Sequence, residues 1–221
     1  MKRRFVLAAL PAVLLLAAAA PKRKPLPEPP LPDSVDVALT TELGTIVVEL
    51  DGKHAPITVR NFLHYVDQKR FDGIAFYRAM HLAWGEQPNG LIQAGTQGDP
   101  RRVLPPIAHE PTSLTGIHHT AGAISMARNA PGTATGEFSI LLSDLDALDA
   151  DPASADPDRQ AGYAAFGHVV SGMDVVKKIW ESPLSPTRGE GAMKGQMLDP
   201  QIRILTARRV PAPVATAAPG S

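Results

Sequence analysis

The feature that most constrains this 221-residue chain is a series of eight short strand-like runs separated by turn-forming residues. Only two segments carry a helical period, so the strands do not alternate with helices as they do in parallel βαβ folds. The first two runs, joined across a turn near Gly44, are expected to form an opening hairpin. The pattern as a whole predicts a mainly β domain built as an antiparallel barrel. The eight runs occupy residues 35–39, 45–50, 74–79, 91–95, 122–127, 138–142, 163–170 and 201–208.

The first helical segment has one apolar face. Val59, Phe62, Leu63 and Val66 recur at the spacing of a single helical stripe. Pro56 suits the first turn of such a helix, where its missing N–H would have no partner in any case. We therefore expect this helix to close over an apolar part of the barrel.

A second helix is expected to begin at Ser171. The Ser171 hydroxyl can cap the helix, and Asp174 stands three residues later in the position of a capping box. Met173, Val176 and Ile179 are expected to face the core.

The N-terminal residues 1–20 have the composition of a targeting segment. Three basic residues at positions 2–4 precede an apolar stretch at 5–16, and small residues follow at 17–20. The apolar stretch is short for a membrane span. We expect an exported, periplasmic protein with no stable membrane insertion after cleavage; without cleavage the segment would instead anchor the chain in the membrane.

The remaining chain divides by composition into three parts. Proline recurs through residues 21–33, which predicts an extended linker. Residues 34–210 hold all the strand and helix signals and form the expected folded domain. The proline- and alanine-rich residues 211–221 are expected to be disordered.

Charge and cysteine content exclude several classes of function. The chain has 22 basic and 22 acidic residues, so nothing in its charge indicates a nucleic-acid partner. It has no cysteine, which excludes disulfides and thiolate zinc sites. Balanced charge and the lack of a long apolar face outside the barrel favour a monomer.

Two clusters of chemically active residues do not form a metal pattern. His109, His118 and His119 lack a spacing that would align them on one face, and no matching carboxylate motif accompanies them. The aspartates between residues 144 and 158 lack the glycine and glutamate of a calcium loop, and prolines interrupt them. We interpret this stretch as a solvated loop and expect no metal.

Residues 122–138 carry the most specific signal. The run at 122–128, followed by Pro131, the stretch 133–135 and Phe138, resembles the central signature of the cyclophilin family of peptidyl-prolyl isomerases. The similarity extends in register over roughly residues 36–208. Further matching segments are 55–63, 76–78, 92–95 and 165–176.

The resemblance implies a closed eight-stranded antiparallel barrel capped by two α-helices, with a peptide groove on its outer face. It also implies an isomerase that acts on Xaa-Pro bonds of proline-containing polypeptides and needs no cofactor. Arg78 matches the family arginine that donates to the prolyl nitrogen as the amide twists, and Arg128 fits bacterial, exported members. The resemblance places the substrate-binding positions at Phe76, Leu91, Gln93, Ala127, Arg128, Glu137, Ser139, Leu148 and Tyr163.

Several of these positions depart from the family pattern. Glu137 stands where glutamine is usual, Ser139 where a phenylalanine floors the proline pocket, and Tyr163 where a histidine borders the ring. Trp84, in an insertion beside the site, or Tyr163 is a candidate to refill the pocket. Such losses leave two hypotheses open: an isomerase, weakened or not, that folds exported proteins, or a non-catalytic peptide-binding or chaperone module.

The geometry of the site is expected to follow the alternation of a strand. Phe76 and Arg78 would share one face, with Tyr77 on the other. Glu137 either forms an ion pair with Arg78 or lies at the lip of the groove without that pair.

Overall fold

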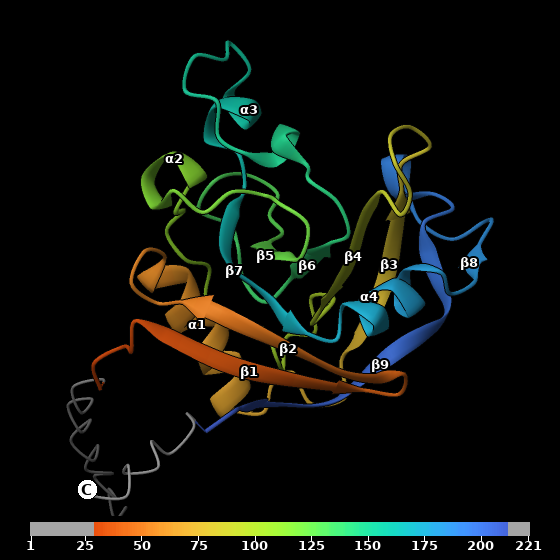
Figure 1. The fold of residues 1–221 in the computed structure, drawn as a ribbon, viewed down its shortest axis with the longest axis horizontal. Helices are drawn as coiled ribbons and strands as arrows, with labels where there is room; N and C mark the ends of the chain where they lie inside the picture. The colour runs from red at the N-terminus through yellow and green to blue at the C-terminus, as the bar shows by residue number, and fades with distance from the viewer. Residues whose placement is uncertain (1–28, 212–221) are drawn as a thin grey trace, which may run out of the picture. The chain divides into compact units, whose positions relative to one another are not determined.

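Nine strands run through residues 29–211, the part of the chain described by a computed structural model (Figure 1). The expected targeting segment, most of the linker and nearly all of the tail lie outside the described residues. The strands are β1 (Ser34–Thr41), β2 (Gly44–Asp51), β3 (Ala75–His81), β4 (Gly90–Gly95), β5 (Ala123–Met126), β6 (Phe138–Leu141), β7 (Ala164–Ser171), β8 (Leu184–Ser185) and β9 (Met197–Arg209).

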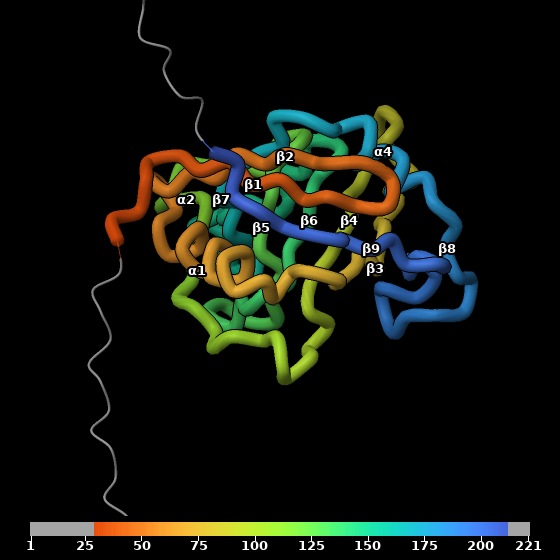
Figure 2. Tube along the Cα trace, turned by 90° about the horizontal axis from the view of Figure 1, so that it is seen from below, coloured from red at the N-terminus to blue at the C-terminus, as the bar shows by residue number. Residues whose placement is uncertain are grey.

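Eight of these strands close into an antiparallel barrel. The strand order is β1-β2-β7-β5-β6-β4-β3-β9-β8, and β1 also pairs with β9, which joins the two sides of the sheet. Figure 2 shows β9 running beside β1, with β2 on the other side of β1. The two-residue β8 adds to β9 outside the ring and was not predicted. The predicted hairpin and barrel are confirmed.

An aromatic cluster fills the barrel. Phe62, Phe71, Phe138 and Phe166 are buried with ring centroids 5.0 to 5.5 Å apart in tilted or edge-on pairs, a favourable arrangement for aromatic rings. Because inward-facing side chains occupy the barrel interior, alternate residues of the same strands face outward. The outer face is therefore available for a binding site.

Two longer helices pack on the barrel, as predicted. Helix α1 (Pro56–Asp67) buries Val59, Phe62, Leu63 and Val66, the predicted stripe, against the core. Its N-cap residue, Ala55, has no side-chain acceptor.

A distant carboxylate supplies the missing cap of α1. Glu110 is 3% exposed and accepts hydrogen bonds from the backbone N–H of Ile57 and of Thr58 and from the Thr58 hydroxyl. Its negative charge also lies at the favourable, N-terminal end of the helix dipole.

Helix α4 (Met173–Trp180) begins differently from the prediction. Ser171 ends β7, and the N-cap is Gly172 in the left-handed conformation with no side-chain cap. A Cβ at Gly172 would overlap the Thr45 carbonyl oxygen, so the close approach to β2 selects glycine over a capping side chain. Val176 and Ile179 are buried as expected, and Met173 packs against the core from a partly buried position.

Short helices lie in the connections between strands. They are α2 (Thr112–Thr115), η1 (Asp146–Leu148), α3 (Pro157–Ala161) and η2 (Gly191–Met193).

None of the helices within residues 29–211 has the length and apolar character needed to cross a membrane.

Candidate active site

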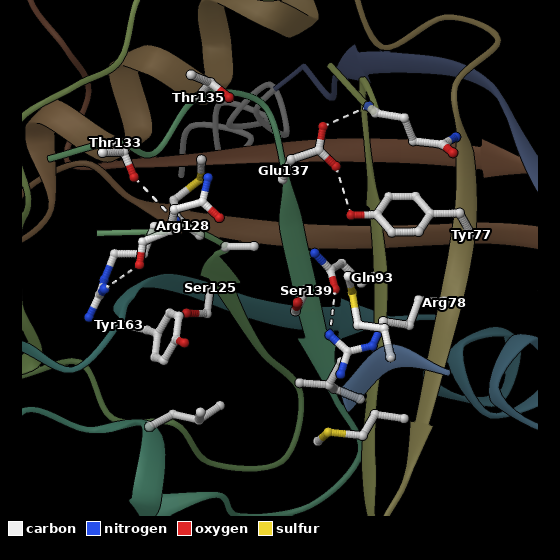
Figure 3. A pocket seen from close by; sticks show the side chains of 18 of the residues that line it. Tyr77, Arg78, Gln93, Ser125, Arg128, Thr133, Thr135, Glu137, Ser139 and Tyr163 are labelled. Carbon is white, nitrogen blue, oxygen red and sulfur yellow. Dashed lines mark hydrogen bonds between the residues drawn. The ribbon is translucent and has the colours of Figure 1, made fainter. Parts of the chain in front are cut away.

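A groove of about 700 Å³ lies on the outer face of strands β3, β4, β5 and β6 (Figure 3). Nine of the ten predicted site residues line it. The nine are Arg78, Leu91, Gln93, Ala127, Arg128, Glu137, Ser139, Leu148 and Tyr163.

Phe76 is the predicted site residue that does not reach the groove. It is 0% exposed and belongs to the barrel core. The prediction failed because strand β3 contains an irregularity: Phe76 pairs with Ala94 and Arg78 with the adjacent Gln93, so Tyr77 is an extra residue on its strand. This bulge breaks the period of two and turns Tyr77 and Arg78 together toward the groove.

Two glutamines hold the Arg78 guanidinium. Nη1 donates to Oε1 of Gln93 at 2.9 Å, and Nε donates to Oε1 of Gln196 at 2.8 Å. Burial lowers the pKa of Arg78 from its ordinary value, yet a guanidinium keeps its charge at neutral pH. The fork is thus a fixed, partly desolvated cation whose remaining N–H donors have no acceptor in the described part of the chain.

An apolar wall stands beside Arg78. Leu91 is nearly buried within a small cluster against which Met80 and Leu148 pack, and all three side chains line the groove. Ser139, 8% exposed, lies on β6 between its strand partners Gln93 and Ser125. A proline ring would find aliphatic neighbours here and a small polar residue, Ser139, beside them.

Tyr163 lines the groove, whereas Trp84 does not. Trp84 is 64% exposed on the loop between β3 and β4, so the hypothesis that it refills the pocket is wrong. The Arg128 guanidinium lies 4.7 Å from the centre of the Tyr163 ring, a distance suited to a cation–π contact.

The Arg128 guanidinium is bound by other groups of the same chain. Its guanidinium donates to the Gly162 carbonyl oxygen from Nη2 at 2.6 Å and to the Asp158 carboxylate from Nη1 at 3.1 Å. Its side chain is 2% exposed. We interpret Arg128 as a residue that fixes Tyr163 and the α3 loop, with little of its charge free for a substrate.

Glu137 does not form an ion pair with Arg78. Its Oε2 accepts from the Tyr77 hydroxyl at 2.8 Å, and its Oε1 accepts from the Thr96 hydroxyl at 3.0 Å and the Gln97 N–H at 2.8 Å. The second of the two predicted alternatives is therefore observed: Glu137 lies at the groove and forms no ion pair with Arg78.

The three histidines considered as ligands have structural partners. His119, 0% exposed, connects Oδ1 of Asp149 through Nδ1 at 2.6 Å with the Ser125 hydroxyl through Nε2 at 2.8 Å. His118 binds the other oxygen of Asp149, and His109 binds the Ala161 carbonyl oxygen. No group of residues in the described chain could hold a metal ion.

Asp149 is an exception within the stretch interpreted as a solvated loop. Burial by itself would raise the pKa of Asp149, but hydrogen bonds from His119 and His118 outweigh that effect and lower the pKa. Leu148, its neighbour, lines the groove, so the Asp149–His119–Ser125 chain ties one groove wall to β5.

Sequence reasoning missed groove residues that come from outside the matching segments. Met193 and Met197 line the groove and Gln196 bonds to Arg78; all three come from the segment before and at the start of β9, and their role carries no local sequence signal. Tyr77 was next to a predicted residue, but only the bulge brings it into the groove.

Comparisons with known proteins agree with this geometry. Residues 35–208 match the family model described as cyclophilin type peptidyl-prolyl cis-trans isomerase. A peptidyl-prolyl cis-trans isomerase of Acinetobacter baylyi is 37% identical over 67% of this chain and 73% of its own length. Peptidyl-prolyl cis-trans isomerase A of Dickeya dadantii is 35% identical over 66% and 71%.

Solved structures support the fold. A crystal structure of a cyclophilin-type isomerase from Cryptosporidium parvum superposes with a TM-score of 0.61 and covers 81% of this chain and 99% of its own. The two sequences are 19% identical, so this likeness speaks for the barrel alone.

Proposed function

This chain belongs to the cyclophilin-type peptidyl-prolyl cis-trans isomerases, and we propose that it accelerates rotation about Xaa-Pro bonds through the guanidinium of Arg78. Its substrates are proline-containing polypeptides. The barrier to rotation is amide resonance, about 20 kcal/mol, and it makes the uncatalysed exchange take tens of seconds or longer. No covalent step is needed, because the reaction only twists the amide.

Arg78 suits the requirement for a donor that acts in the transition state. As the amide twists, the prolyl nitrogen becomes pyramidal and can accept a hydrogen bond that the planar ground state does not offer. A bond made only in the twisted state lowers the barrier without stabilising the substrate. One preorganised charged donor is worth about 3–4 kcal/mol, or about 10²- to 10³-fold in rate.

The apolar wall supplies the second contribution. Leu91, Leu148 and Met80 form the surface against which a proline ring can pack. Each buried CH₂ group of the ring contributes about 0.8 kcal/mol, so three methylenes contribute about 2 kcal/mol to binding. The single observation that carries the proposal is the fixed Arg78 fork beside this wall.

The test is the rate of exchange of a proline peptide, measured by NMR without a coupled protease. We expect the wild type to accelerate exchange and Arg78→Ala to lose about 10²-fold or more in kcat/KM. Arg101→Ala is the matched control, because Arg101 is an exposed arginine paired with Asp99 outside the groove. If the wild type gives no acceleration, the chain is a peptide-binding module; equal rates for wild type and Arg78→Ala would remove Arg78 from the mechanism.

The site residues and the compartment complete the proposal. We assign substrate contact to Leu91, Gln93, Ala127, Ser139 and Tyr163, which line the groove. The basic, apolar and small-residue sequence of positions 1–20 supports export to the periplasm, cleavage of this segment and action on exported proteins. The balance of 22 basic and 22 acidic residues supports a monomer. Intact-mass measurement after cell fractionation tests this: an uncleaved protein in the cytosolic fraction would contradict export, and a dimer by light scattering would contradict the monomer.

A further inference from the structure

The Glu137 carboxylate lies in the groove as an anion. All three donors to it, the Tyr77 and Thr96 hydroxyls and the Gln97 N–H, are neutral. Burial and then the Glu137 charge raise the pKa of Tyr77 from its ordinary value, so its hydroxyl remains a neutral donor. Within residues 29–211, Glu137 makes no ion pair, although a half-buried carboxylate gains most from an opposite charge.

The fold holds this carboxylate in place. It packs against Gly95, where any Cβ would overlap the carboxylate atoms, and Gly95 has a φ of +156°. The backbone of Glu137 is tied to the residue that follows β5, because its carbonyl oxygen accepts from the Ala127 N–H at 2.9 Å. With the side chain bonded at both oxygens and the backbone bonded to Ala127, the negative charge has a fixed position.

The surroundings of Glu137 are polar and differ from the wall beside Arg78. The neighbouring groove residues Gln97, Thr133 and Thr135 carry no charge. In Figure 3, Gln93 and Ser139 lie between Glu137 and Arg78. The groove therefore presents a cation beside the proline wall and an anion farther along, and a peptide lying along it meets both charges.

We propose that Glu137 selects substrates with a lysine or arginine side chain close to the proline in sequence. The inference rests on the proposed isomerase function and adds a substrate class to it. The Arg78 charge repels a basic side chain from the proline wall, while Glu137 attracts it at the other end, so the two charges also set the direction in which a peptide lies. Opposed charges of this kind contribute chiefly to specificity.

The experiment is a lysine scan around one proline. Lysine, norleucine or glutamate is placed in turn at each of the three positions before and the two positions after the proline, and kcat/KM is measured by NMR exchange. Norleucine keeps the aliphatic stem and removes the charge. We expect lysine to exceed norleucine by about three- to tenfold at one or two positions, glutamate to fall below norleucine there, and 0.5 M salt to shrink the ratio.

Three variants assign the preference to Glu137. Glu137→Gln keeps the shape and should bring the lysine-to-norleucine ratio to about one, while Glu137→Asp, which keeps the charge, should retain part of it. Glu181→Gln removes the same charge from the end of α4, paired with Lys177 outside the groove, and should leave the ratio as in wild type. Because the ratio is taken within each variant, it does not depend on any change in overall rate; thermal midpoints check that each variant folds.

The outcomes are distinct. A ratio near one at every position of the wild type, or a ratio that survives Glu137→Gln, overturns the selection by Glu137 even if norleucine peptides are isomerised well. If no peptide at all is accelerated by the wild type, the proposed isomerase function fails instead.

Discussion

Gln196 offers the sharpest test of how Arg78 is positioned. It stands 118 residues from Arg78 in sequence, and its side chain accepts from Arg78 Nε at 2.8 Å. Its backbone is anchored separately, because its carbonyl oxygen accepts from the Ala79 N–H and its own N–H donates to Met193. Gln196→Leu should therefore remove the side-chain acceptor without moving the segment.

The expected size follows from the bond that is lost. A hydrogen bond to a charged group contributes about 1.5–3 kcal/mol, and partial exposure of Arg78 places this one at the lower end. We expect kcat/KM to fall about tenfold, which corresponds to about 1.4 kcal/mol. Since Arg78 acts on the twisted amide, the loss should appear in kcat more than in KM.

A matched control and a double-mutant cycle show whether the loss of rate acts through Arg78. Gln68 at the end of α1 accepts from Arg70 Nε at 2.7 Å in the same way, but outside the groove, so Gln68→Leu should leave the rate unchanged. In an Arg78→Ala background, Gln196→Leu should cause no further loss. A tenfold loss in that background as well would refute the positioning role.

Two further predictions concern stability. Burial lowers the pKa of His119 from its ordinary 6.5, so the unfolded chain takes up this proton at a higher pH than the folded chain does. The free energy of unfolding should therefore fall as the pH drops from about 6.5 toward the folded-state pKa of His119. A further loss is expected below pH 3.8, because the pKa of Asp149 is also lower in the folded chain than its ordinary 3.8. Urea titrations at pH 7, 6 and 5 check this, and an equal pH slope in His119→Gln would contradict it. Glu110→Ala should lower the free energy of unfolding by about 2–4 kcal/mol, since it leaves two N–H groups of α1 and the Thr58 hydroxyl without their acceptor; a loss below 0.5 kcal/mol in urea, the size typical of a surface substitution, would show that water replaces the cap.

The predicted and observed structures differ where contacts with another strand override a rule based on neighbouring residues, such as strand alternation or helix capping. Alternation placed Phe76 beside Arg78, but the bulge in β3 put Phe76 in the core. Capping preference placed the start of α4 at Ser171, but the approach of β2 required Gly172. In both cases the local rule was outweighed by pairing or packing against another strand.

Local periodicity predicted the eight strand-like runs, the apolar helical stripe from Val59 to Val66 and an antiparallel barrel. These features depend on which side chains are buried away from water, and the spacing of apolar residues shows which side chains those are. The spacing does not show which groups the charged side chains bind. Only the folded chain shows three of these partners. Gln196 accepts from Arg78, Glu137 accepts from Tyr77, and the Gly162 carbonyl oxygen accepts from Arg128. Each is a contact between distant segments, and its geometry is fixed by the closed barrel.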